Sequence, residues 1–300
     1  MSLHTTPRLV TTVAGLREAL APHRAAAARI GLVPTMGALH EGHLSLVRAA
    51  RAACGVVVVS VYVNPSQFGP REDFAHYPRS LETDVAAVAA CSADFVFAPD
   101  DAEVYPPGFD TWVEVGGVSE PLEGRHRPGH FRGVATVVLK LLNMVGPQAA
   151  YFGLKDIQQF RVLEQMVRDL NVPVDLVPCA TVREADGLAM SSRNAYLSPA
   201  ARGEAGVVFE SLRTAQRLVD EGRRCAATVA AAMRQVILSA KGASIDYAEI
   251  VDPRTLRPVE RVDGVALAVL AVRLEETRLI DNALIVPPGT CRERAIGDGR

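Results

Sequence analysis

Apolar and polar positions follow two alternating patterns along the first part of the chain. Residues 56–63 (VVVVSVYV) form a nearly unbroken β-branched run, typical of a central parallel strand that is covered on both faces. Shorter strand-like runs lie at 95–98, 150–152 and 174–177. Apolar residues recur at helical spacing between these runs, at 44–53, 81–90, 134–145 and 157–170. This alternation predicts an α/β domain with a doubly wound parallel sheet.

The pattern changes after about residue 180. Ser198-Pro199 is a favourable helix start, and apolar residues continue at helical spacing as far as Val219. A second helix is predicted over 226–238. Three strand-like runs follow with short connections and predict a small antiparallel sheet, at 244–251, 265–272 and 278–286. The sequence therefore predicts two domains, 1–181 and 182–300, of which the second is a smaller α+β domain.

The composition is that of a folded globular protein, since 49% of the 300 residues are apolar and 22% are charged. The net charge of −2 gives no indication of a nucleic-acid partner. No apolar run is long enough to span a bilayer, and the first residues, MSLHTTPRLV, lack the apolar core of a signal peptide. We therefore expect a cytoplasmic protein without a membrane partner.

The cysteines argue against two kinds of site. Their number is odd, they are scattered, and no two form a CxxC pair; they are Cys54, Cys91, Cys179, Cys225 and Cys291. Neither a disulfide framework nor a zinc site is predicted. We expect most of them to be small buried apolar residues.

The segment PTMGALHEGH, residues 34–43, links an apolar stretch to a helical one. Amide groups and the helix dipole at such a helix start attract anions, and glycines allow close backbone approach. His40 and His43 are one turn apart, so they can add two donors on the same side. This pattern favours a nucleotide site over a pair of solvated histidines. A zinc site is disfavoured, because the i, i+3 spacing differs from the i, i+4 spacing of HExxH.

Two more polar clusters follow strand-like runs. Asn64 and Gln67 come directly after the 56–63 run, where ligands gather in parallel sheets, although an ordinary Asn-Pro turn is an equal alternative. The polar residues at 71–79 are predicted to be solvated. Lys155 can neutralise phosphate and Asp156 can accept from ribose hydroxyls. The alternative there is a helix N-terminus that an acidic residue stabilises.

Two polar loops complete the candidate chemistry. The loop 183–194 contains Ser191, Ser192 and Arg193, two hydroxyls and a guanidinium that suit a triphosphate. A solvated linker is the alternative. The basic segment 125–133 precedes a helix, and either lines the site or caps that helix.

Together these clusters closely resemble the pantoate–β-alanine ligase family. The resemblance covers nearly the whole chain and rests on PTMGALHEGH (34–43), VNPSQF (63–68), YPRSLETD (77–84), RPGHFRGV (127–134), GLKDIQQ (153–159), DGLAMSSRN (186–194) and TRLIDN (277–282). It implies a Rossmann-like nucleotidyltransferase domain of the HxGH type with a smaller C-terminal lid domain, acting as a homodimer. It also implies that (R)-pantoate attacks ATP to give pantoyl adenylate and pyrophosphate. β-Alanine then displaces AMP, and Mg²⁺ accompanies the triphosphate.

The resemblance assigns residues to substrates by position. The implied ATP-binding residues are Met36, Gly37, Ala38, Leu39, His40, Glu41, Gly42, His43, Gly153, Leu154, Lys155, Asp156, Val182, Met190, Ser191, Ser192 and Arg193. The implied catalytic residues are His43, His40, Lys155 and Arg193. Gln67 and Gln159 would hold pantoate, and Gln67 and Asn64 would hold β-alanine. No protein ligand for Mg²⁺ is implied, since the ATP phosphates carry the metal.

The chain departs from the usual family pattern at three positions, where we expect effects on packing or affinity. Leu154 stands where the family usually has Glu, Ser66 replaces a frequent Met, and Tyr62 replaces a frequent Phe. Two other functions stay open at this point. One is a nucleotidyltransferase that acts on another phosphate or carboxylate compound. The other is a nucleotide-binding module without catalytic activity.

Overall fold

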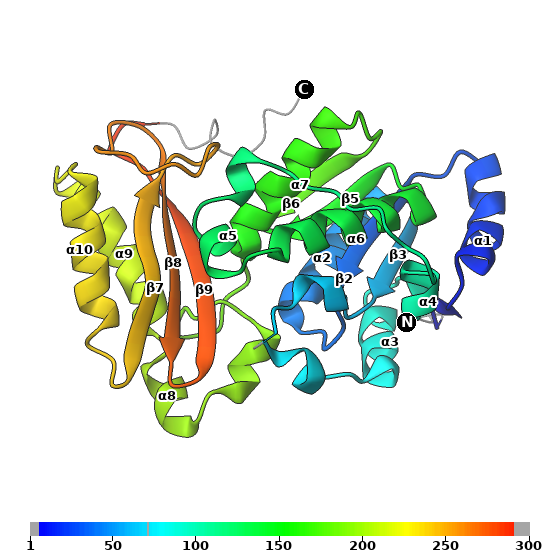
Figure 1. Ribbon diagram of the computed structural model, residues 1–300, viewed down its shortest axis with the longest axis horizontal. Helices are drawn as coiled ribbons and strands as arrows, with labels where there is room; N and C mark the ends of the chain where they lie inside the picture. Colours follow the sequence, from blue (N-terminus) through cyan, green and yellow to red (C-terminus); the bar gives the residue numbers. More distant parts are fainter. Residues whose placement is uncertain (1–5, 71, 291–300) are drawn as a thin grey trace. The chain divides into compact units, whose positions relative to one another are not determined.

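The computed structural model describes residues 6–70 and 72–290 (Figure 1). Contacts within the described chain divide it into two compact units. The first comprises residues 6–119, 123–154 and 159–180, and the second comprises 120–122, 155–158 and 181–290. Cys291 and the rest of the C-terminal tail lie outside the described residues.

The first unit is built on a six-stranded parallel sheet, which confirms the predicted doubly wound α/β fold. The strands are β1 (Arg8–Val10), β2 (Ile30–Thr35), β3 (Val56–Val61), β4 (Phe95–Phe97), β5 (Ala149–Gly153) and β6 (Asp175–Cys179). Their order is β1-β4-β3-β2-β5-β6. The chain moves outward from β2 through β3 and β4, and then crosses back to β5 on the other side. The order therefore reverses between β2 and β5, where open α/β sheets bind ligands beyond the carboxyl ends of the strands.

Alternating side chains bury the central strands on both faces. In β3, Val56 and Val58 enter one core cluster, whereas Val57 and Val59 enter another. The first cluster is shared with α1 (Val13–Ala25), α6 (His130–Val145) and α7 (Ile157–Asp169). The second is shared with α2 (Glu41–Ala53) and α3 (Leu81–Ala89). Burial on both faces is why this strand reads as a continuous apolar run.

Short helical segments join these elements. They are α4 (Asp101–Val104), α5 (Glu123–His126) and the 3₁₀ turns η1 (Pro65–Gln67), η2 (Asp73–His76), η3 (Gly117–Ser119) and η4 (Leu154–Asp156). The sequence pattern did not predict β1 and α1, which lie before the first predicted element. Pro22 lies inside α1 and interrupts its apolar pattern, although the Thr12 hydroxyl caps its start by accepting from the amide of Gly15 at 3.1 Å.

The second unit contains the predicted antiparallel sheet, in the order β7-β8-β9. Its elements are η5 (Ser192–Tyr196), α8 (Pro199–Glu204), α9 (Val207–Asp220), α10 (Ala226–Ile237), β7 (Ala243–Val251), β8 (Ala266–Leu274) and β9 (Thr277–Ile285). α9 and α10 pack on one face of this sheet around a separate apolar core (Figure 1). The single helical pattern predicted from Ser198 to Val219 is two helices, because the chain turns at Ala205 and Gly206, where glycine disfavours helix.

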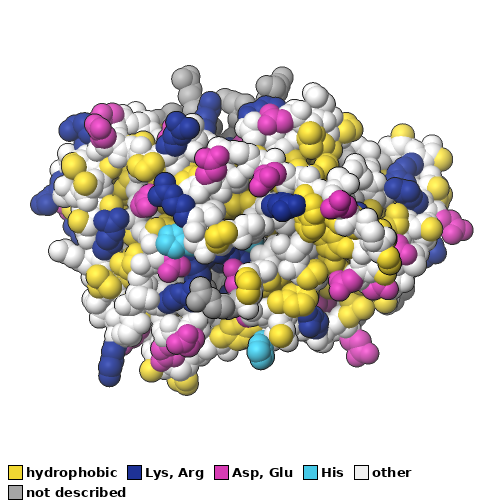
Figure 2. Space-filling view, viewed as in Figure 1, with side chains coloured by type: hydrophobic (Ala, Val, Ile, Leu, Met, Phe, Trp, Pro, Cys, Tyr) yellow, Lys and Arg dark blue, Asp and Glu magenta, His cyan; other side chains and the backbone are white. Residues whose placement is uncertain are grey.

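The surface charges agree with expectation, whereas the burial of the cysteines agrees only in part. On the face drawn in Figure 2, basic and acidic side chains are interspersed, in line with the small net charge. Among the described cysteines, all of them free, Cys54 and Cys91 are buried, whereas Cys179 is half-buried and Cys225 is exposed. The expectation that most are buried therefore holds for only two of these four. None of the described helices is long and apolar enough to cross a bilayer.

Candidate active site

The turn after β2 has an unusual backbone that a buried carboxylate holds in place. Gly37 and Ala38 both have positive φ angles, of 81° and 49°. The carboxylate of Asp84, from the first turn of α3, accepts from the amide of Ala38 at 3.1 Å and from the amide of Leu39 at 2.8 Å. A Cβ atom at position 37 would lie 2.8 Å from this carboxylate, so glycine is required there. Asp84 therefore fixes the path of the turn into α2.

Burial and hydrogen bonding act on Asp84 in opposite directions. The residue is only 3% exposed, and burial raises the pKa of its carboxyl above the ordinary value, although the two amide donors lower it. In the sequence, Asp84 is one of two acidic residues, with Glu82, in the first turn after Ser80. Ser80 does precede α3, but its hydroxyl contacts the Thr83 hydroxyl at 2.7 Å and makes no cap hydrogen bond.

His40 and His43 form a reciprocal cap at the start of α2. The amide of Gly42 donates to Nδ1 of His40 at 3.1 Å, and the amide of His40 donates to Nδ1 of His43 at 3.3 Å. The two rings lie 4.1 Å apart. Because Nδ1 accepts in both rings, the proton of each neutral imidazole is on Nε2. Two Nε2–H donors thus stand beside the helix start, as an anion site requires. α2 begins three residues before the predicted 44–53 helix. The prediction was late because histidine is an unusual capping residue, so the sequence pattern does not indicate a cap at His40.

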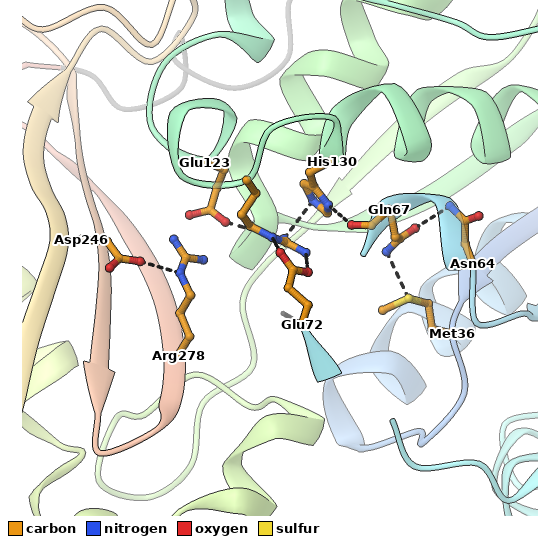
Figure 3. A network of polar contacts seen from close by, with 9 residues as sticks. Met36, Asn64, Gln67, Glu72, Glu123, His130, Asp246 and Arg278 are labelled. Carbon is orange, nitrogen blue, oxygen red and sulfur yellow. Dashed lines mark hydrogen bonds and ion pairs between the residues drawn. The ribbon is translucent and has the colours of Figure 1, made fainter. Parts of the chain in front are cut away.

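Asn64 and Gln67 follow β3, which pairs with β2, so they lie beside the turn that holds Met36 (Figure 3). Asn64 is 1% exposed, and its Nδ2 donates to Oε1 of Gln67 at 3.0 Å. Its Oδ1 accepts from the hydroxyls of Ser66 and Tyr105, each at 2.8 Å. Nε2 of Gln67 reaches Sδ of Met36 at 3.1 Å. Asn64 therefore orients the Gln67 amide toward the turn after β2.

The third predicted cluster follows β5, the other neighbour of β2. Gly153 ends β5, and Leu154 packs against the core cluster on that face of the sheet. Gln159 is half-buried on the first turns of α7. The first unit thus carries parts of three predicted clusters at the carboxyl ends of three adjacent strands.

Lys155 and Asp156 belong to the second unit, together with the 183–194 loop. There Nδ2 of Asn282 donates to the carbonyl of Lys155 at 2.9 Å, so β9 holds the backbone at this lysine. The amide of Met190 donates to the carbonyl of Val182 at 3.0 Å, which closes the loop. The Ser191 hydroxyl accepts from the amide of Arg193 at 3.3 Å and caps η5.

A buried ion pair anchors the same loop to β9. Nη1 and Nη2 of Arg183 contact the two carboxylate oxygens of Asp281 at 2.6 and 3.0 Å, and Nη1 also donates to the carbonyl of Gly187 at 3.0 Å. The guanidinium lies 4.2 Å from the ring centre of Phe209. The Asp281 side chain is fully buried, and burial raises the pKa of its carboxyl although Arg183 opposes that shift. This anchor makes the 183–194 loop an ordered structure, where a solvated linker was the alternative.

Comparison with known proteins identifies the family of this chain. A family profile for Pantoate-beta-alanine ligase matches residues 8–284. The chain belongs to the pantoate–β-alanine ligase family. The pantothenate synthetase of Roseiflexus sp. (strain RS-1) is 53% identical over 278 residues, covering 93% of this chain and 99% of that protein.

Solved structures of the family agree. The crystal structure of pantothenate synthetase from Thermus thermophilus has a TM-score of 0.89 at 47% identity, covering 93% of this chain and 100% of that one. The pantoate-beta-alanine ligase of Francisella tularensis, complexed with beta-gamma ATP and beta-alanine, has a TM-score of 0.76 at 32% identity, covering 93% and 97%. The resemblance in the sequence motifs is therefore confirmed, and the activity of the chain is pantoate–β-alanine ligation.

The sequence pattern missed several residues that hold the turns of this site in place. The prediction of a solvated 71–79 loop is wrong for two residues: Glu72 forms an ion pair with Arg127, and Tyr77 is buried against Phe68. Asp84 was also missed. No spacing rule identifies Glu72 or Asp84, because their partners lie 55 and 46 residues away in the chain. Among the residues that the structure describes, no group of three or more His, Cys, Asp or Glu side chains is arranged to hold a metal ion.

Proposed function

We propose that the chain condenses (R)-pantoate with β-alanine through a pantoyl-adenylate intermediate, with ATP as co-substrate. The observation that carries the proposal is the pair His40 and His43, held as two Nε2–H donors at the start of α2 beside the strand-order reversal. The Francisella relative, which is described as complexed with beta-gamma ATP and beta-alanine, supports both ligands.

In the first half-reaction, a carboxylate oxygen of pantoate attacks the α-phosphorus of ATP, and the bond to the pyrophosphate oxygen breaks. Negative charge develops on the phosphoryl oxygens, and positioned N–H donors and cations stabilise it. We assign this task to His40, His43, Lys155 and Arg193. The wider proposed ATP-binding set is Met36 to His43, Gly153 to Asp156, Val182 and Met190 to Arg193.

In the second half-reaction, the amine of β-alanine attacks the acyl carbon, and the bond to the adenylate oxygen breaks to release AMP. Gln67 and Gln159 hold pantoate in this proposal. Gln67 and Asn64 serve β-alanine, with Asn64 acting through the orientation it gives to the Gln67 amide. The acyl adenylate reacts readily with water, which gives the 183–194 loop a purpose in covering the intermediate.

The proposal extends to the metal, the domains and the assembly. Mg²⁺ enters with the ATP phosphates, residues 1–181 bind nucleotide and pantoate, and residues 182–300 act as the lid. The enzyme is a cytoplasmic homodimer, and the free cysteines described above are compatible with a reducing compartment. A titration of pyrophosphate release against Mg²⁺ and the sedimentation of the full chain test the metal and the dimer.

The function is tested by pyrophosphate release from ATP and Mg²⁺ when pantoate is added without β-alanine. We expect a burst of pyrophosphate close to the enzyme concentration, followed by slow turnover until β-alanine is supplied. Release with another acid but not with pantoate would assign the chain a different acceptor. ATP binding without release on any acid would indicate a non-catalytic module.

A further inference from the structure

His130 joins the basic segment before α6 to the turn that holds Gln67. It is the first residue of α6 and is 8% exposed. Its Nδ1 lies 2.9 Å from the carbonyl oxygen of Gln67, and its Nε2 lies 3.0 Å from Nη1 of Arg127 (Figure 3). A guanidinium only donates and a carbonyl only accepts. Nε2 of His130 therefore accepts from Arg127, and Nδ1–H donates to Gln67.

The ring is neutral as well as fixed in its tautomer. Burial and the adjacent Arg127 lower the pKa of His130 to about 4. Its proton on Nδ1 is thus retained across the neutral pH range, and the ring is a permanent donor toward the Gln67 carbonyl.

Arg127 is itself held from two sides. Its Nε and Nη2 donate to the two carboxylate oxygens of Glu72 at 2.8 and 2.6 Å, a bidentate pair. Its Nη1 lies 3.7 Å from a carboxylate oxygen of Glu123, one turn earlier in the chain. The guanidinium therefore cannot rotate away from His130 without losing this pair.

The backbone at Gln67 is also fixed from its N-terminal side. α6 approaches η1 so closely that a Cβ atom at Gly133 would lie 2.3 Å from the carbonyl oxygen of Ser66 and 2.7 Å from the amide of Gln67. Nδ2 of Asn64 donates to the carbonyl of Gly133 at 3.3 Å. His130 and Gly133 of α6 thus fix the backbone from which the Gln67 side chain projects.

From this geometry we propose that His130 is a positioning residue for the pantoate site, with Arg127 and Glu72 fixing its tautomer. It acts through the carbonyl of Gln67, whose side chain then lies against Met36 and Asn64. This inference rests on the proposed role of Gln67 in binding pantoate. In this role His130 does not need to contact a substrate.

Two substitutions separate the two contacts of the ring. In His130→Asn, the amide nitrogen is as many bonds from Cβ as Nδ1 is, so it can still donate to the Gln67 carbonyl. In His130→Gln, the amide group reaches the place of Nε2 and keeps only the contact with Arg127. We expect His130→Gln to raise the KM for pantoate by about tenfold, the size of one hydrogen bond, with the KM for ATP unchanged. His130→Asn should restore most of the pantoate KM.

Val145→Ala is the matched control, because it shortens a fully buried side chain at the far end of α6. It should lower Tm without changing the KM for pantoate. Equal behaviour of the Asn and Gln variants, or a parallel rise in the KM for ATP, would overturn the positioning role.

Gln67→Ala distinguishes this inference from the proposed function. If Gln67→Ala raises the KM for pantoate but His130→Gln does not, the inference fails and the proposed function stands. If Gln67→Ala leaves that KM unchanged, the assignment of pantoate to Gln67 fails, and the inference fails with it. ¹⁵N NMR of the wild-type ring provides a readout apart from activity. We expect a protonated Nδ1 and an unprotonated Nε2 at neutral pH, whereas the opposite tautomer or an imidazolium would overturn the inference.

Discussion

Replacing Asp84 with asparagine keeps the size of the side chain but changes its hydrogen bonding to the turn after β2. The wild-type carboxylate accepts from the amides of Leu39 and Ala38. Asparagine has one acceptor oxygen, so one amide would face an NH₂ group and lose its partner. Losing a hydrogen bond to a charged acceptor costs about 1.5–3 kcal/mol. The substitution also removes a buried carboxylate, so we expect a net loss of about 1–2 kcal/mol in the free energy of unfolding.

The catalytic effect of Asp84→Asn should exceed its effect on stability. The unpartnered amide lies at Ala38, three residues from the helix start, so the turn and the two histidines should shift together. A misplacement of about 1 Å can cost on the order of 10²-fold in rate. We therefore expect pyrophosphate release to slow by about 10- to 100-fold, with little change in the KM for pantoate.

Stopped assays of pyrophosphate release and urea unfolding measure these two effects. Glu82→Gln is the control, because Glu82 lies exposed in the same first turn of α3. Burial raises the pKa of Asp84, so the native state binds its proton more tightly than the unfolded state does. Wild type should therefore gain stability relative to Asp84→Asn as the pH falls from the raised pKa toward 3.8. A variant with wild-type rate and stability would refute the role of Asp84 in fixing the turn.

Three other perturbations test separate parts of the structure. His43→Ala should lower the rate of pyrophosphate release by about 10²- to 10³-fold, as expected for the loss of one transition-state donor, while circular dichroism stays unchanged. Arg183→Met leaves the Asp281 carboxylate buried without its cation and should cost about 3–5 kcal/mol in urea unfolding, less at acid pH, where that carboxyl is protonated; an unchanged midpoint would show that the pair does not anchor the loop. His130 contributes stability above its unfolded pKa of 6.5, which is lost as the pH falls toward its folded pKa of about 4. This loss should reach about 3 kcal/mol and be absent in His130→Asn.

The sequence predicted the sheet and the position of the nucleotide turn because both depend on local patterns. The β-branched run in β3 and the glycines around His40 and His43 have few structural alternatives. The start of α2 was predicted late because its cap is an imidazole, which composition rules do not include. α1 was missed because Pro22 interrupts its helical pattern, and β1 was missed because a strand of 3 residues is too short to show a pattern.

The supporting residues could not be predicted from local pattern. Asp84 contacts an amide that is 46 residues earlier in the chain, and Arg127 contacts a carboxylate that is 55 residues earlier. Both residues are charged and lie in polar stretches. Solvated surface segments have the same sequence pattern. Only the fold shows that they are partly or fully buried and paired, and that they hold the turns from which Gln67 and the two histidines project.

The most direct test of the adenylate mechanism follows the carboxylate oxygen of pantoate. Pantoate labelled with ¹⁸O in its carboxylate is converted with ATP, Mg²⁺ and β-alanine, and the products are separated and analysed by mass spectrometry. Attack on the α-phosphorus, followed by breakage of the acyl carbon–oxygen bond, predicts one ¹⁸O in AMP and none in pyrophosphate. AMP without label, or label released in inorganic phosphate, would contradict the adenylate mechanism.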